Sequence, residues 1–400
     1  MRQRRRTIVF AGSLALLQCA GMSYASRTEK KRRSLSLADF GGVPGANARA
    51  IAAAFGAAFE ELKEEGGGKL VIPEGVYDLG SLSNGVAIEV AQLRNVLIAG
   101  HGAQLTMETA AEGAGNNFTP AFFRFVNPER VTVAGLAFKG YGSNLAFRKS
   151  GGRQGAVCID VFASRPCEGF KTVDCVADDV VTFLRSDNRS NPYQMSGFDI
   201  HATVRNSYYG IQMLRNGRYS RCRLTTLNVR RAFISHATRD WDIGVAARRT
   251  QGPGSNAHVV LDTFPDGPVL DCTISVSASG DLDGYDCLGS ICHQGPDGSY
   301  SFARNVRFTI AIENSSSAPR SGFIAFTAEP ESGIPPGIRS TTAGAWENIS
   351  IKGTVPSSYK GRVVANPSVS SARTNSIYIA ANLSRFLDAD SLPPYFRVMK

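Results

Sequence analysis

Short apolar segments separated by polar corners recur along the chain, and three of them between residues 172 and 238 align as copies of one unit. Each copy has a polar or aromatic pair at a corner and then a short apolar strand, in which Val181, Ile211 and Phe233 fall at the same position. A single turn and strand cannot bury its apolar side alone, so the copies must stack on one another. The pattern therefore predicts an all-β solenoid with its chemistry on one exterior face.

The corner pairs of the three copies are Asp178-Asp179, Tyr208-Tyr209 and Arg230-Arg231. Their first residues are 30 and then 22 residues apart, which is within the periods of about 20 to 50 residues that solenoids use. Irregular spacing between the other strands predicts inserted loops, which tend to gather on one face of a solenoid and form its binding site. The largest predicted loops are residues 109–119, 186–194, 238–258, 280–299 and 328–344.

Residues 47–65 follow a helical period instead. Their apolar positions recur on one face, and the segment ends at Gly66-Gly67-Gly68, which is a typical helix stop. The face consists of Ile51, Ala54, Phe55, Ala58, Phe59 and Leu62. This stripe needs apolar surface to cover.

The section from residue 37 to about 106 resembles the N-terminal part of the pectate-lyase superfamily, including its polygalacturonase-related glycoside hydrolases. The resemblance is carried by Asp39-Phe40-Gly41, the alanine-rich helix with its glycines, Val71–Tyr77 and Ile98–Ala103. It implies a right-handed parallel β-helix whose N-terminal end is capped by the helix. One departure is the absence of acidic residues just before the helix, in Val43–Arg49.

The first 25 residues have the pattern of a cleaved export signal. A basic start is followed by an apolar core and by small residues at Ser23-Tyr24-Ala25, as signal peptidases require. Arg5-Arg6 also fits a twin-arginine signal, and an N-terminal anchor helix is the alternative. Residues 26–36 are expected to be a basic leader and 37–400 a single β-helix domain, exported to the periplasm or secreted. No long uncharged apolar stretch follows, so no membrane span is expected.

Charge and cysteine content bear on three further possibilities: a nucleic-acid partner, disulfide bonds and a zinc site. The formal charge is +10, but the signal and the leader each account for four positive charges, which leaves about +2 for the body and argues against a nucleic-acid partner. Seven of the eight cysteines follow the signal; Cys167/Cys175 and Cys287/Cys292 are near enough to pair, with buried single thiols as the alternative. Neither cysteine nor histidine spacing indicates zinc.

Carboxylates at the corners are the first catalytic candidates. Stacked strands lie about 4.8 Å apart, so groups two coils apart are separated by nearly 10 Å, close to the 6.5–9.5 Å of an inverting glycosidase. Asp178 and Asp179 with Asp240 or Asp242 would form such a pair if the later loop folds back. Paired aspartates also occur in polygalacturonase-like hydrolases, and the resemblance extends no further than these two. The alternative is that they cap a turn.

The segment from His236 to Asp242 is the second candidate. Alternation places His236 outside, beside Arg239, Asp240 and Trp241, and an exposed indole would stack on a sugar ring while the charged groups hold its hydroxyls. A structural salt-bridged loop is the alternative.

These residues predict an enzyme that hydrolyses a polysaccharide. A lyase is the runner-up, because β-elimination needs a base and a cation that neutralises a uronate carboxylate. The groups for that chemistry are Tyr208, His236, Arg185, Arg215 and Arg239. Tyr208 and Tyr209 are expected either to line a cleft or to form an aromatic stack. A non-catalytic glycan-binding protein is a third reading. No cofactor is expected, although the acidic segment Asp281-Leu-Asp283-Gly284-Tyr-Asp286 could offer oxygens to calcium; a solvated turn is the alternative.

Overall fold

Strands of the chain pair with the strand one coil earlier and one coil later, always in parallel. The structure, a computed structural model, describes residues 33–82, 85–109, 120–141, 155–186, 195–212, 217–251, 255–263, 268–293, 302–320, 322–327, 345–357, 359, 362–365, 375–387 and 396–399. These residues form two sheets, of 20 and 10 strands, which we call sheet A and sheet B. The predicted parallel β-helix is confirmed.

Sheet B contains one short strand from each coil. Its strands are β4 Val86–Ala91, β7 Ala121–Val126, β10 Val157–Phe162, β13 Thr182–Arg185, β16 Tyr209–Gln212, β18 Arg231–His236, β20 Ser255–Thr263, β23 Tyr285–His293, β26 Gly322–Thr327 and β28 Val364–Ala365.

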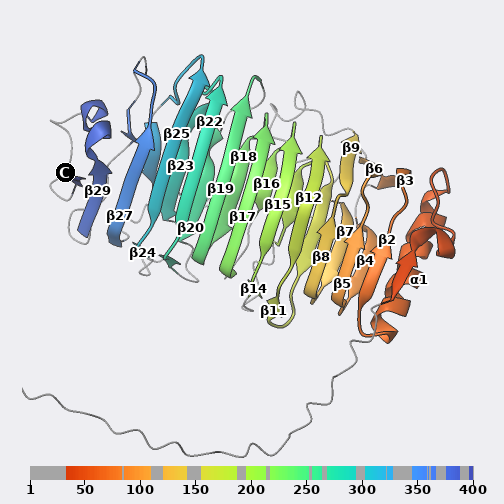
Figure 1. The fold of residues 1–400 in the computed structure, drawn as a ribbon. Helices are drawn as coiled ribbons and strands as arrows, with labels where there is room; N and C mark the ends of the chain where they lie inside the picture. The colour runs from red at the N-terminus through yellow and green to blue at the C-terminus, as the bar shows by residue number, and fades with distance from the viewer. Residues whose placement is uncertain are drawn as a thin grey trace, which may run out of the picture. The chain divides into compact units, whose positions relative to one another are not determined.

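Sheet A contains the longer strands of the same coils, together with short strands that precede them. Its strands are β1 Ser34–Ser36, β2 Gly68–Val71, β3 Gly75–Leu82, β5 Arg94–Ala99, β6 Ala103–Thr109, β8 Glu129–Ala134, β9 Ala137–Tyr141, β11 Cys167–Glu168, β12 Lys171–Asp178, β14 Met195–Ser196, β15 Asp199–Arg205, β17 Gly217–Leu227, β19 Arg239–Arg249, β21 Val269–Leu270, β22 Thr273–Gly280, β24 Phe302–Arg304, β25 Arg307–Ser315, β27 Ala345–Thr354, β29 Asn375–Ala380 and β30 Phe396–Met399. In Figure 1, β12, β15, β17, β19, β22 and β25 lie side by side in chain order.

The interior is a column of apolar side chains repeated from coil to coil. On sheet B, Ile159, Leu184, Ile211 and Phe233 occupy one register, and all are fully buried. The predicted match of Ile211 with Phe233 is therefore confirmed. The match with Val181 is wrong by three residues, because Val180 and Val181 belong to the corner and the strand starts at Thr182.

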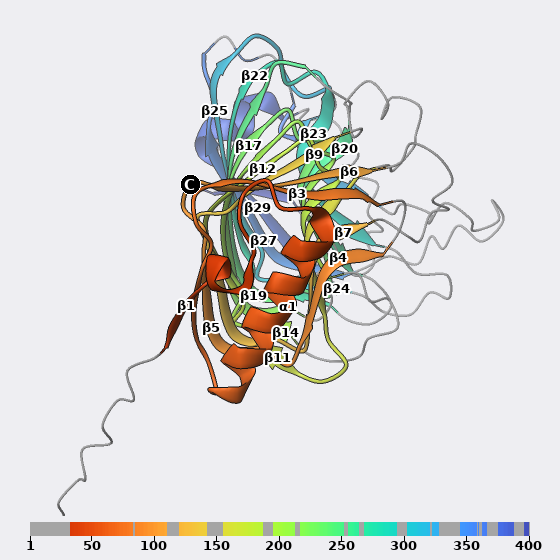
Figure 2. The ribbon, with the colours of Figure 1, turned by 90° about the vertical axis from the view of Figure 1, so that its right-hand side faces the viewer.

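Helix α1, Ala48–Glu64, covers the N-terminal end of the coils (Figure 2). The Asn47 side chain accepts a hydrogen bond from the Ala50 amide and caps the helix. All six residues of the predicted apolar stripe are buried, and Phe55 meets Phe123 of β7 edge to face at 5.4 Å. Because α1 closes the end of the apolar column, the predicted cap is confirmed. No helix in the described part of the chain is long and apolar enough to span a membrane.

A left-handed backbone position recurs where each short strand of sheet A bends into the next. Asp240 has φ of 55°, and Asp271, Asn305 and Asn348 have φ of 54°, 57° and 52° at the equivalent place in later coils. Asp and Asn adopt this conformation at low cost. The Asn305 amide also donates to Asp271 at 2.7 Å, and Asn348 to Asn305 at 2.7 Å. These side chains hold neighbouring coils in register.

Several predicted boundaries need correction. Ser34–Ser36 form β1 and pair with β2, so the domain begins within the predicted leader. The predicted loops at 238–258 and 280–299 contain β19 and β23, because polar residues there alternate on the outer face of a strand and do not signal a loop. The other predicted loops lie largely outside the described residues, as does the predicted signal, residues 1–25.

The cysteines in the described residues are buried and unpaired, as the second interpretation predicts. Burial raises the pKa of Cys175 to about 11 and that of Cys222 to about 12. A disulfide between Cys167 and Cys175 is therefore wrong, and Cys292 lies outside the residues whose side chains are described.

Candidate functional site

The predicted aspartates do not come together. Asp178 and Asp179 lie at the corner where sheet A passes into sheet B, whereas Asp240 and Asp242 lie at the opposite end of β19. In register, Asp178 falls in the row of Arg248, six residues or about 20 Å along the strand from Asp242. The predicted acid and base pair is therefore wrong.

The corner explains the paired aspartates as turn residues. The Asn206 side chain donates to Asp178 at 2.9 Å, and Asn228 donates to Asn206 at 3.3 Å. Asp179, Asn206 and Asn228 have positive φ of 53°, 46° and 57°. These hydrogen bonds and left-handed conformations fit the alternative interpretation, in which the paired aspartates cap a turn.

The corner tyrosines form a buried cluster. Tyr208 and Tyr209 are 6% and 4% exposed, and their rings meet at 4.6 Å. The Arg230 guanidinium lies 4.4 Å from the Tyr208 ring centroid. Their prediction as an aromatic stack fits this geometry, and their burial does not suit a cleft lining.

Trp241 and His236 are also buried. The Trp241 indole is 1% exposed and packs on Phe233 at 5.3 Å inside the solenoid, so the prediction of an exposed indole is wrong. His236 is 7% exposed at the end of β18. Left-handed residues at Ala237 and Asp240 separate the alternation of β18 from that of β19. Within β19, Trp241 is buried and Asp242 lies on the outer face.

The predicted arginines are dispersed. Arg185 lies on the outer face of sheet B, where it bonds to Asp160 at 3.0 Å together with Arg124, also at 3.0 Å. Arg239 begins β19. Arg215 lies outside the described residues.

The acidic segment that was considered as a calcium site instead binds an arginine side chain of the same protein. Arg249 donates to the Asp281 backbone oxygen at 3.0 Å and to its carboxylate at 3.2 Å, and Asp283 lies 3.8 Å away. The guanidinium supplies the cation that these oxygens would otherwise attract. The described residues contain no group of acidic, histidine and cysteine side chains suited to a metal.

An open groove of about 530 Å³ lies on the outer face of sheet A, across β12, β15, β17, β19, β22 and β25. Its ionisable lining residues are Asp174, His201 and Arg223. Small and hydroxyl side chains from successive coils supply most of the rest, among them Thr203, Thr225, Ala246, Ser275, Ser277 and Thr309. Long strands with small outward residues leave room for a ligand along the solenoid axis.

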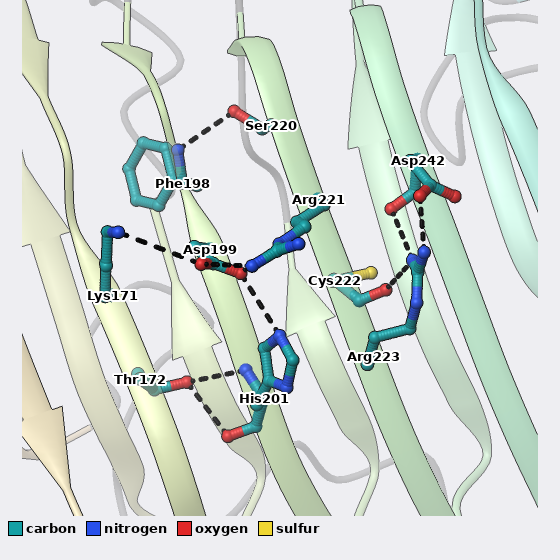
Figure 3. Close-up of polar contacts among 10 residues, drawn as sticks. All are labelled: Lys171, Thr172, Phe198, Asp199, His201, Ser220, Arg221, Cys222, Arg223 and Asp242. Carbon is teal, nitrogen blue, oxygen red and sulfur yellow. Dashed lines mark hydrogen bonds and ion pairs between the residues drawn. The ribbon is translucent and has the colours of Figure 1, made fainter.

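Asp199 is the centre of a charged cluster beside the groove (Figure 3). Arg221, its register partner on β17, donates to it through two nitrogens at 2.6 and 2.9 Å. Lys171 lies 3.9 Å away. The hydrogen bond from Arg221 is the main cause that lowers the pKa of Asp199, with its charge, His201 and Lys171 acting in the same direction. Asp199 is therefore a carboxylate at neutral pH.

Asp199 orients His201, two residues later on the same strand. The His201 Nε2 lies 3.2 Å from Asp199 Oδ1, and an ionised carboxylate there can only accept, so Nε2 carries the proton. Thr172 fixes the backbone, accepting from the His201 amide and donating to its carbonyl, both at 3.1 Å. Nδ1 is left as the basic nitrogen of a half-exposed ring.

Arg223 is the register partner of His201 on β17, so both side chains leave the same face of adjacent strands. Its guanidinium donates to the backbone oxygens of Cys222 at 2.8 Å and Asp242 at 3.1 Å, and also to the Asp242 carboxylate. Figure 3 shows Arg223 reaching across to Asp242 on β19. Of the predicted residues, Asp242 therefore lies beside the groove, where it holds Arg223.

Sequence reasoning missed Asp199, His201, Arg221 and Arg223. A signal was present, because Asp199-Ile-His201, Arg221-Cys-Arg223 and Asp242-Ile-Gly244 begin 22 and then 21 residues apart. Each has two outward positions on consecutive coils. An oriented imidazole beside a fixed guanidinium can remove a proton and stabilise the negative charge that forms.

No protein-family model matches the sequence, and no curated protein matches it. Among solved structures, the chain resembles ORF18 of Geobacillus virus E2 at 10% identity, with 74% of this chain and 60% of that chain covered and a TM-score of 0.38. An endo-xylogalacturonan hydrolase from Aspergillus tubingensis matches at 12% identity over 87% and 91% of the two chains, with a TM-score of 0.44. The catalytic domain of a GH87 α-1,3-glucanase in complex with nigerose matches at 13% identity over 94% and 69%, with a TM-score of 0.40.

The chain thus spans 60% of the viral protein's length. Matches at these identities and TM-scores carry no argument about activity. The parallel β-helix rests on the strand pairing itself, and it is the fold that the resemblance to the pectate-lyase superfamily implies.

Proposed function

We propose that the protein is an exported enzyme that cleaves a uronate-containing polysaccharide in the groove of sheet A by β-elimination. The observation that carries this proposal is the Asp199-oriented His201 beside Arg223, both in the lining of one groove. The predicted export signal supplies the location, because such polymers lie outside the cell.

The reaction needs a base and a cation. His201 Nδ1 removes the proton from the carbon next to the uronate carboxylate, and the electron pair of that C–H bond forms a double bond to the neighbouring carbon. The bond from that carbon to the glycosidic oxygen breaks, and the oxygen takes a proton from the imidazolium or from water. Arg223 neutralises the carboxylate, which makes the carbon acid stronger.

Hydrolysis is the second candidate, because of one observation. Asp199 and Asp242 occupy the same register two strands apart, with Arg221 between them. Their backbones are therefore about 10 Å apart, near the upper end of the separation for inverting hydrolysis. Each carboxylate already accepts a hydrogen bond from an arginine, so neither is placed to donate a proton to the leaving group; for this reason elimination is preferred.

The test is incubation with uronate-containing and neutral polysaccharides, following reducing ends and the ultraviolet absorbance of unsaturated products. Both signals together support elimination, reducing ends alone support hydrolysis, and binding without either contradicts the proposal. His201→Gln should lower the rate at least about 100-fold, with the protein still folded. Asp179→Asn is the control, since Asn tolerates the left-handed conformation, and it should retain activity; loss of activity there would return the site to the paired aspartates.

A further inference from the structure

We propose that the groove binds a single carboxylate, through the Nε and Nη2 edge of Arg223. Its substrate is then a polysaccharide in which each acidic sugar lies between neutral sugars. This inference rests on the proposed function for the cleavage step, but it concerns recognition and has its own test.

The hydrogen bonds of Arg223 leave one edge available. A guanidinium has five N–H donors. Nη1 donates to the backbone oxygens of Cys222 and Asp242, and Nη2 donates to the Asp242 carboxylate. The described residues thus account for three donors, and those that remain, on Nε and Nη2, lie side by side. That edge matches the two oxygens of a carboxylate.

Gly244 gives Arg223 the space to lie in this position. A Cβ at Gly244 would be 2.7 Å from Arg223 Cδ, a distance that real Cβ atoms essentially never show, and 3.2 Å from its Nε. The Arg223 side chain therefore crosses β19 directly above this glycine. Any larger residue would displace the edge that faces the ligand. Gly244 and Asp242 are positioning residues for Arg223.

Apart from Arg223 and the imidazole of His201, the groove lining is uncharged or negative. Among the described lining residues Arg223 is the sole arginine or lysine, and Asp174 is the one carboxylate. The lining residues that β19, β22 and β25 supply are Gly244, Val245, Ala246, Ser275, Val276, Ser277, Thr309 and Ala311. A second carboxylate in that part would lose water without gaining a cation. Neutral sugars can instead use the serine and threonine hydroxyls.

Binding to the His201→Gln variant tests this without degradation of the probe. The probes are gellan, a linear polymer in which each glucuronate lies between neutral sugars, and polygalacturonate, in which every sugar is acidic. We expect gellan to bind at least about 10-fold more tightly per site, a difference that one unpaired charge can cause. Equal or reversed affinities would overturn the proposal.

Gly244→Ala tests the positioning. In the same background it should weaken gellan binding about 10-fold, the loss of one charge-assisted bidentate contact, and Arg223→Met should weaken it at least as much. The double variant should bind no worse than Arg223→Met alone, because both changes remove one interaction. Gly56→Ala, on α1, where an added Cβ would meet no atom within 4 Å, is the matched control and should leave gellan binding unchanged. Independent, additive losses would contradict the role of Gly244.

The two proposals can fail separately. Gellan preference with no product from any polymer would end the enzyme proposal and leave this inference standing. Unsaturated products formed equally well from both polymers would support the enzyme proposal and overturn this inference about recognition.

Discussion

His258 lies inside the solenoid with no exposed surface, its Nε2 3.3 Å from Thr226 Oγ1 and its ring 4.7 Å from that of Tyr285. Burial lowers the pKa of His258 to about 4. A protonated imidazole would lose its water there without a compensating charge. The residue is therefore neutral in the native protein.

This burial predicts an acid-sensitive native state. Above pH 6.5 neither the folded nor the unfolded imidazole takes up a proton, and stability is unaffected. As the pH falls from 6.5 toward 4 only the unfolded chain binds the proton, so the free energy of unfolding decreases by up to about 3 kcal/mol. Urea denaturation at a series of pH values measures this free energy. Its decrease between pH 6.5 and pH 4 should be smaller for His258→Gln than for the wild type. The exposed His101→Gln is the control, and the same decrease in all three proteins would contradict this account.

Asp199 should respond to its arginine partner. Arg221→Met removes the largest cause of the low pKa of Asp199, so that pKa should rise toward its ordinary value. The carboxyl resonance of Asp199 in a nuclear magnetic resonance titration measures this directly. If elimination needs the carboxylate to hold His201, the acid limb of the activity profile should move to higher pH as well. Arg307→Met, in the same outward row of sheet A, should leave both unchanged.

At the scale of elements, the corners hold the coils in register. Asn228 accepts hydrogen bonds from the amides of Thr250 at 2.9 Å and Gln251 at 3.2 Å, and it donates to Asn206. Its backbone is left-handed, with φ of 57°. Side chain and backbone conformation therefore both favour asparagine at this position.

Replacing Asn228 separates these two contributions. Asn228→Ala should destabilise the protein by about 2–4 kcal/mol, since it loses the hydrogen bonds and forces alanine into a left-handed conformation. Asn228→Gly should cost about 1 kcal/mol less, because glycine adopts that conformation freely. Urea denaturation measures both. Equal losses would show that the backbone conformation does not matter here.

Elements were predicted with uneven success. The apolar matches of Ile211 with Phe233 and of the α1 stripe follow from local periods and could be predicted. The Val181 match failed because Val180 and Val181 belong to the corner that follows the left-handed Asp179. An alignment of apolar residues cannot distinguish them from the strand that begins at Thr182. β19 was predicted as a loop because its outward charged residues look like loop composition, although every second residue is buried.

The whole molecule is a stack in which each coil contacts its neighbours, so its ends need protection. Phe55 is fully buried between α1 and the first coils. Phe55→Ala should cost about 3–5 kcal/mol, and hydrogen exchange should increase first in β4 and β7, beneath the helix. Ala53→Ser, on the exposed face of α1, should change neither. Uniform exchange along the stack would contradict a local capping role.

The sequence by itself determined the coiled fold, its helical cap and the alternation of buried and outward positions, because each depends on residues close together in the chain. The tertiary structure decided which outward residues meet. His201 and Arg223 share a groove, with Asp199 beside it, because β15 and β17 pair in one register. Their offset of 22 residues can be found in the sequence, but the face that each side chain takes depends on corners that interrupt the alternation. It also decided that Trp241 and Tyr208 are buried, since left-handed corner residues such as Asn206, Ala237 and Asp240 interrupt the alternation of faces along the chain.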